Sequence, residues 1–151
     1  MCARCKSPYW DRERQKILKT KYLDVEDIVS INKRVIKEIP VKKSDKHEVL
    51  NRSAIILTIN SCKKQTGDVW DKSVVLLRGI IKKHPFASGN RRTAIVAMVT
   101  FLNKNKLETK IRNNQSLDKI LQGVREDYYT LEEIKNWIKG GEINDFVRRG
   151  N

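Results

Sequence analysis

One short stretch of the chain, residues 84–94, combines residue types that bind and transfer phosphate. It reads HPFASGNRRTA. Its glycine lets the backbone approach an anion, and the guanidinium groups of Arg91 and Arg92 match the geometry of phosphate oxygens. The unperturbed pKa of a histidine is about 6.5, so His84 can take a proton from a hydroxyl at neutral pH. The stretch predicts transfer of a phosphate-containing group to a hydroxyl. A structural histidine in a basic turn is the alternative.

Two segments with helical periodicity must position this stretch. Apolar residues recur every three or four positions before it and after it: Trp70, Val74, Leu77 and Ile81, then Ala94, Ala97, Met98 and Phe101. The first amides of a helix lack intrahelical partners and lie at the positive end of the helix dipole. A glycine-containing turn that enters the second helix is therefore a natural anion site.

The rest of the chain also favours helices. Asp24 is a candidate N-cap for a helix that Pro40 ends, Ser116 is another candidate, and Thr130 with Glu133 forms a capping-box pattern. Residues 45–60 are less clear, because their IILTI run is rich in β-branched side chains and fits a short strand or hairpin as well. We predict a compact all-α single domain, with a β-hairpin in that segment as an open alternative.

The composition limits the class of protein. With 151 residues, 39% of them hydrophobic and 33% charged, the chain suits one globular domain with one core. Its net charge of +14 indicates an anionic partner, and nucleic acid, a nucleotide and an acidic protein all qualify. A solvated basic surface is the alternative. No apolar run approaches the roughly 20 residues that cross a bilayer, so we expect a cytoplasmic protein without membrane contact.

The cysteines do not predict a metal site. Cys2 and Cys5 have the spacing of half a zinc knuckle, but no second pair of ligands follows them. We interpret them as an incidental pair and assign them no role.

The sequence HPFASGNRRTA closely resembles the signature of the Fic/Doc superfamily. The Fic branch reads HxFx[D/E]GNGRxxR, and the death-on-curing (Doc) branch reads HxFx[D/N]xNKRTA. The matches to the Doc form are His84, Phe86, Asn90, Arg92, Thr93 and Ala94, with Arg91 where that form has Lys. The flanking segments YLDVEDIVSINKRVI, LLRGIIKKHPF and TFLNKN are also similar to this family. The resemblance covers residues 22–140, with an N-terminal extension at 1–21 and a tail at 141–151, and it implies the all-α Fic fold.

The resemblance also implies an activity. Family members transfer a phosphate-containing group, usually AMP from ATP, to a hydroxyl of a target protein. Doc-type members instead phosphorylate the target, notably a translation elongation factor, and are toxins restrained by an antitoxin. The roles it implies are general base for His84, loop-orienting anchor for Phe86, anion hole for Gly89 and Asn90, and nucleotide phosphate binding for Arg91 and Arg92.

Two departures from the Fic form favour the Doc-like branch, and one puts the metal in doubt. Arg91 replaces a glycine and Ile95 replaces the last arginine, which favours transfer of the terminal phosphate of ATP or another nucleoside triphosphate. Ser88 stands where the family has the acidic residue that holds Mg²⁺, and a neutral hydroxyl is a poor ligand for that ion. AMP transfer and a catalytically impaired nucleotide-binding protein stay open.

Two expectations concern partners. An acidic antitoxin suits the charge of +14, and residues 42–62 lie where the family has its target-positioning flap. Nucleic-acid binding is the competing class, because basic chains make phosphate contacts. The chain shows no recognisable RNA-binding or zinc-finger motif, so we rank that class lower.

Overall fold

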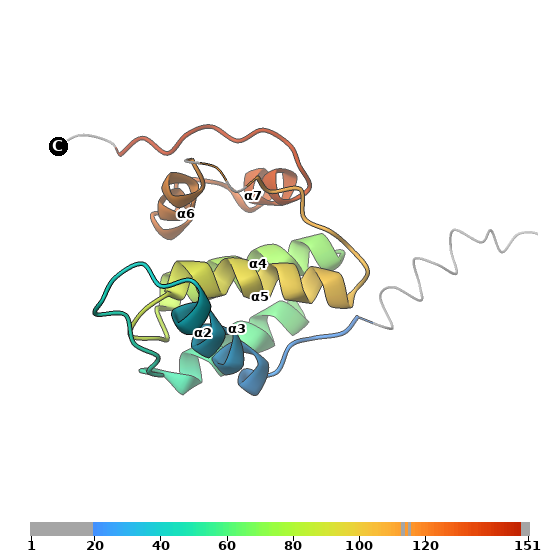
Figure 1. Ribbon diagram of the computed structural model, residues 1–151. Helices are drawn as coiled ribbons and strands as arrows, with labels where there is room; N and C mark the ends of the chain where they lie inside the picture. The colour runs from blue at the N-terminus through green and yellow to red at the C-terminus, as the bar shows by residue number, and fades with distance from the viewer. Residues whose placement is uncertain (1–19, 113, 115, 149–151) are drawn as a thin grey trace, which may run out of the picture.

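The computed structural model describes residues 20–112, 114 and 116–148. Six helices occur among them (Figure 1). They are α2 (Val25–Glu38), α3 (Arg52–Lys64), α4 (Val69–Lys83), α5 (Asn90–Lys104), α6 (Leu117–Arg125) and α7 (Leu131–Ile138). No strand occurs among these residues, so the all-α prediction is confirmed. Cys2 and Cys5 lie outside the described residues.

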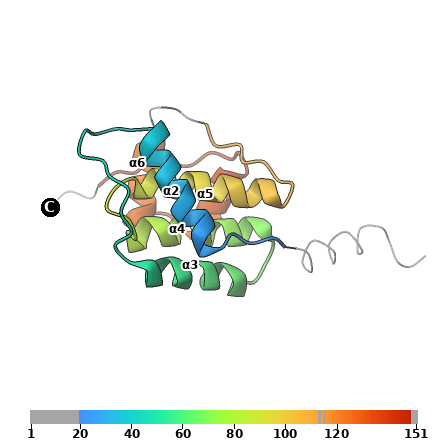
Figure 2. The same cartoon turned by 60° about the horizontal axis from the view of Figure 1, so that its bottom comes forward.

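Helices α4 and α5 form the centre of the fold. In Figure 1 they lie side by side, with α6 and α7 on one side and α2 and α3 on the other. In the turned view of Figure 2, α2 crosses in front of α5 and α3 runs beside α4. Because both central helices have neighbours on two sides, they contribute most of the fully buried large side chains: Leu76, Leu77, Ile80, Ile81, Met98, Phe101 and Leu102. The loop between them is therefore anchored at both ends in the core.

The helix starts follow the capping patterns of the sequence in most cases. Asp24 caps α2 in a capping box, and Thr130 with Glu133 does the same for α7, as predicted. The prediction for Ser116 was wrong in one respect. It precedes α6, but its side chain makes no cap hydrogen bond, and its backbone N–H donates to Asn114 Oδ1 (2.9 Å).

The IILTI run is helical, so the open alternative of a short strand or hairpin is wrong for this part of residues 45–60. The run lies within α3, where Asn51 caps the first turn by accepting from Ala54 N–H (3.0 Å). Ile55 and Ile59 are buried, whereas Ile56 and Leu57 are exposed. This separation has the period of a helix, and packing of α3 against α4 and α2 overrides the β preference of branched side chains.

The connection from α2 to α3, residues 39–51, is called here the α2–α3 loop. In Figure 1 it runs beside the yellow-green loop between α4 and α5. Leu50 N–H donates to Pro85 O (2.8 Å) and Ala87 N–H donates to Glu48 O (2.9 Å). Within the described residues, the β-type pairing here is a single antiparallel bridge between Val49 and Phe86.

No helix in the described ranges has both the length and the apolar character needed to cross a bilayer.

Candidate functional site

The loop between α4 and α5, residues 84–89, is called here the motif loop. It is bracketed by two residues with left-handed backbone, His84 (φ 51) and Gly89 (φ 74). Between them, Phe86 is buried, and the Asn90 side chain clamps its backbone. Asn90 Oδ1 accepts from Phe86 N–H (3.0 Å), and Asn90 Nδ2 donates to Phe86 O (2.8 Å). Asn90 thus shapes the loop, and its amide is used within the loop.

Gly89 leaves the start of α5 open to a ligand. As the N-cap of α5 it provides no side-chain cap, whereas capping side chains serve α2, α3, α4 and α7. The positive φ favours glycine here, whereas the nearest atom to an added Cβ, Ile36 Cδ1 at 2.9 Å, is the end of a flexible side chain that can shift. The first amides of α5, at the positive end of its dipole, are suited to an anion.

His84 lies at the surface with its ring partly covered, and its electrostatic surroundings suit it to act as a base. Partial burial of the ring lowers its pKa below the ordinary histidine value, and the positive charges of Arg125 and Arg91 lower it further. The ring is therefore neutral at pH 7 and can accept a proton.

A cavity of about 780 Å³ brings the predicted site residues together. The predicted residues that line it are His84, Ser88, Gly89, Asn90, Arg91 and Arg92. Phe86 is not among the lining residues and lies buried under the loop. Sequence reasoning therefore placed these six residues around one space. It did not find the two carboxylates that also line the cavity, those of Asp45 and Asp118.

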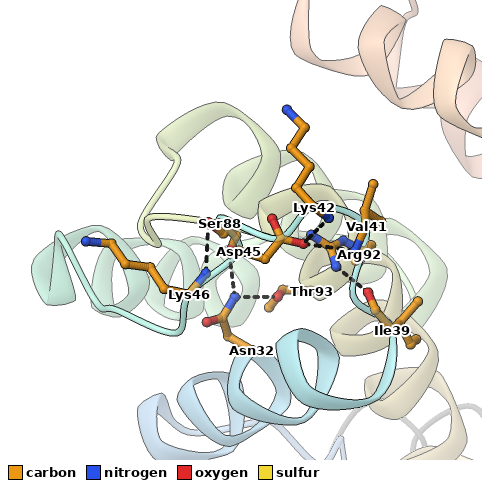
Figure 3. A network of polar contacts seen from close by, with 9 residues as sticks. All are labelled: Asn32, Ile39, Val41, Lys42, Asp45, Lys46, Ser88, Arg92 and Thr93. Atoms are coloured by element: carbon orange, nitrogen blue, oxygen red, sulfur yellow. Dashed lines mark hydrogen bonds and ion pairs between the residues drawn. The ribbon is translucent and has the colours of Figure 1, made fainter.

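Both arginines of the site are paired with these carboxylates. Arg91 Nη1 lies 2.8 Å from Asp118 Oδ1, and both side chains are exposed. Arg92 Nη2 donates to Asp45 Oδ2 (3.0 Å), and its Nη1 donates to Ile39 O (Figure 3). The positive charge of the site is partly balanced by groups of the protein itself.

A second, more apolar cavity of about 540 Å³ adjoins the first. Arg91, Arg92 and Asp118 line both. The apolar side chains around it come mainly from α5 and α6: Ile95, Val96, Met98, Val99, Leu117 and Leu121. Together the cavities suit a ligand with an anionic end and an apolar body.

The donor groups do not fit a magnesium ion. Ser88 Oγ accepts from Lys46 N–H (3.3 Å), and the carboxylates of Asp45 and Asp118 are bound to arginines. In the part of the chain that the structure describes, no three His, Cys, Asp or Glu residues cluster in a way that could hold a metal ion. Mg²⁺ prefers carboxylate and phosphate oxygens.

Sequence reasoning missed Asn32 of α2, whose side chain is hydrogen-bonded to the backbone of the motif loop. Its fully buried amide nitrogen donates to Ser88 O and Thr93 Oγ1, both at 2.9 Å, and its Oδ1 lies 2.7 Å from His47 Nδ1. A signal was available, because Asn32 lies on the apolar face of its helix, four residues after Ile28. A polar side chain at such a position needs partners in the core.

The match to known families agrees with this geometry. The model of the Fic/DOC family matches residues 22–102, more than half of the chain. The chain belongs to the Fic/DOC family. The match spans α2 to α4, the motif loop and most of α5, so the Fic/DOC region contains the pocket-forming loops described above. This family is known for transferring nucleotide-derived groups to proteins. Comparison with curated proteins and with solved structures gives no match.

Proposed function

We propose that this Fic/DOC protein transfers a phosphate-containing group from a nucleoside triphosphate, such as ATP, to a hydroxyl of a target protein. The main support is a single cavity. It is lined by the neutral His84, by the uncapped start of α5 and by Arg91 and Arg92. The adjoining apolar cavity supports a nucleotide as donor, because a nucleotide joins an anionic chain to a planar, less polar body.

The proposed chemistry assigns one task to each group. His84 takes the proton of the target hydroxyl as its oxygen bonds to phosphorus. The first amides of α5 and the guanidinium groups of Arg91 and Arg92 hold the charge that develops on the phosphoryl oxygens. The bond from phosphorus to the bridging oxygen then breaks. The leaving group is ADP when the terminal phosphate moves and pyrophosphate when AMP moves.

The Doc-type kinase reaction is the finer proposal. It rests on the resemblance of the motif, in which Arg91 takes the place of the Fic glycine and Ile95 that of the last Fic arginine. The target would then belong to the translation machinery, with a translation elongation factor as the first candidate. An acidic antitoxin is the proposed restraining partner, and the net charge of +14 supports it.

A catalytically impaired nucleotide-binding protein is the second candidate. The observation that favours it is the donor set, in which Ser88 offers a hydroxyl and the nearby carboxylates are bound to arginines. If a metal ion normally supplies ~4 kcal/mol to the transition state, its loss slows transfer by roughly a thousandfold. Arg91 and Arg92 would offset part of this loss by neutralising phosphate charge.

Labelled ATP separates these candidates. The purified chain and a cell lysate are incubated with ATP carrying label on the α- or the γ-phosphate, with and without Mg²⁺. Protein-bound label from the γ position alone supports the kinase, and label from the α position supports AMP transfer. His84→Ala should abolish the label, while Lys83→Ala, a change at the exposed neighbouring residue, should keep it. If no label depends on His84, transfer from ATP is excluded and the impaired protein is favoured.

Restoring the acidic residue tests the explanation of a slow reaction. Ser88→Asp should raise transfer and make it more dependent on Mg²⁺, because a carboxylate beside the phosphates completes a ligand set for the ion. An unchanged rate in a chain that binds ATP would count against Ser88 as the cause.

A further inference from the structure

Arg92 is held by the α2–α3 loop at two points. Its Nη1 donates to Ile39 O, and its Nη2 donates to Asp45 Oδ2 at 3.0 Å. Figure 3 shows the guanidinium group between these two acceptors, with Val41 and Lys42 close by. Both terminal nitrogens of an arginine predicted to bind phosphate are thus bonded to the protein itself.

Asp45 is more than a surface partner of this arginine. Its Oδ2 also accepts from the backbone amides of Val41 (3.0 Å) and Lys42 (3.1 Å), and its side chain is only 8% exposed. These backbone hydrogen bonds, and secondarily Arg92, hold the pKa of the carboxyl below its ordinary value, so it is ionised at neutral pH. One carboxylate oxygen therefore closes the turn at residues 41–45 and attaches that turn to Arg92.

We propose that Asp45 is an internal competitor for the anion site: its carboxylate occupies Arg92, and a phosphate that takes Arg92 displaces Asp45 and releases residues 39–45. The proposal rests on the proposed function, because it takes phosphate as the ligand of this site. The reason is geometric. The Nη2 hydrogen bond given to Asp45 is one that an incoming phosphate oxygen needs, and the ion pair lines the cavity that contains His84 and Gly89.

Release of the loop follows from the same contacts. When Arg92 turns to a phosphate, the turn at residues 41–45 loses the cation that balances its carboxylate. Ile39 and Val41 at its start are 51% and 68% exposed, so little apolar burial holds this part in place. Residues 48–51 keep their backbone hydrogen bonds to the motif loop. Anion binding is therefore coupled to opening of one half of the loop.

Asp118 provides a matched control. It lines the same cavity and pairs with the neighbouring Arg91 at 2.8 Å, but its side chain is 67% exposed. An exposed ion pair of this kind contributes little. Asp118→Asn removes the same charge from the same cavity as Asp45→Asn, so a general gain of positive potential affects both variants alike.

The first test measures binding of inorganic tripolyphosphate to the full chain by calorimetry. Asp45→Asn should bind it about tenfold more tightly than the unaltered chain, because a charge-assisted competitor is removed. Asp118→Asn should change binding by about twofold or less. Equal effects of the two substitutions, or no binding by any of the three chains, would overturn the proposal.

The second test needs no substitution and reads the loop directly. Hydrogen exchange at the amides of Val41 and Lys42, which donate to Asp45, should become faster when tripolyphosphate is added. Unchanged protection at saturating anion would overturn the coupling. Failure of the proposed function looks different: the anion then binds and opens the loop, but no label passes from ATP to protein.

Discussion

The two loops that enclose the cavity differ in what holds them. The motif loop joins two core helices, and buried amides of Asn90 and Asn32 bond to its backbone. Residues 39–45 of the α2–α3 loop are held mainly by one arginine and are largely exposed. Segments with few buried contacts open at low free energy, whereas segments fixed in the core do not. The motif loop thus fixes the groups of the candidate site, and in our proposal residues 39–45 are the part that anion binding releases.

The largest expected effect comes from breaking the fixed loop. Asn90→Ala leaves the N–H and C=O of Phe86 without partners in a buried position. Each buried unsatisfied group costs ~1–3 kcal/mol, so we expect the free energy of unfolding in urea to fall by about 3 kcal/mol or more. Asn103→Ala, an exposed change on the same helix, should alter it by less than about 0.5 kcal/mol. Similar values for the two variants would contradict the clamping role of Asn90.

A smaller loss of folding stability is expected at Gly89, where the motif loop joins α5. Gly89→Ala places a side chain on a left-handed backbone and brings Cβ to 2.9 Å from Ile36 Cδ1. The backbone term is ~1–2 kcal/mol, and the contact adds a smaller amount, because the terminal methyl of Ile36 can shift. In an Ile36→Ala background the contact disappears, so the loss from Gly89→Ala should shrink while the backbone part stays. An identical loss in both backgrounds would show that Ile36 does not restrict this position.

The smallest effect concerns the base and shows up in pH dependence. Transfer needs neutral His84, so the rate should rise with pH through the histidine pKa and be full above it, with a midpoint below the ordinary histidine value. Arg125→Ala removes a positive neighbour, and the pKa should rise. Transfer at slightly acidic pH should then fall, while transfer at pH 8 stays the same. The His84 ring resonance, followed by proton NMR, measures this shift without a target. No shift would contradict the electrostatic cause.

The fold was largely predictable because its signals are local. Apolar periodicity and the caps at Asp24 and Thr130 located helices, and the motif located the loop between two of them. The IILTI run stayed open between helix and hairpin because its local β preference competes with the burial of Ile55 and Ile59, and that burial decides for the helix. That burial depends on contacts with distant segments, which a local pattern does not contain.

The candidate site was predictable only on the motif side. The six lining residues fall within nine positions of one another, so their types could be read together. Asp45 lies 47 positions from Arg92, and Asn32 lies 61 positions from Thr93. Nothing in the local sequence joins these pairs, and only the packing of α2 and its following loop against α5 brings them into contact.

The anion site at the start of α5 is tested most directly by following backbone amide signals of the isotopically labelled chain during titration with ATP. We expect the largest shifts at Gly89, Asn90, Arg91 and Arg92, where the open start of α5 receives the phosphates. His84→Ala should keep these shifts and lose transfer, because it removes the base and leaves the anion site. Shifts scattered over exposed lysines, with none at the start of α5, would show that the phosphates do not bind there.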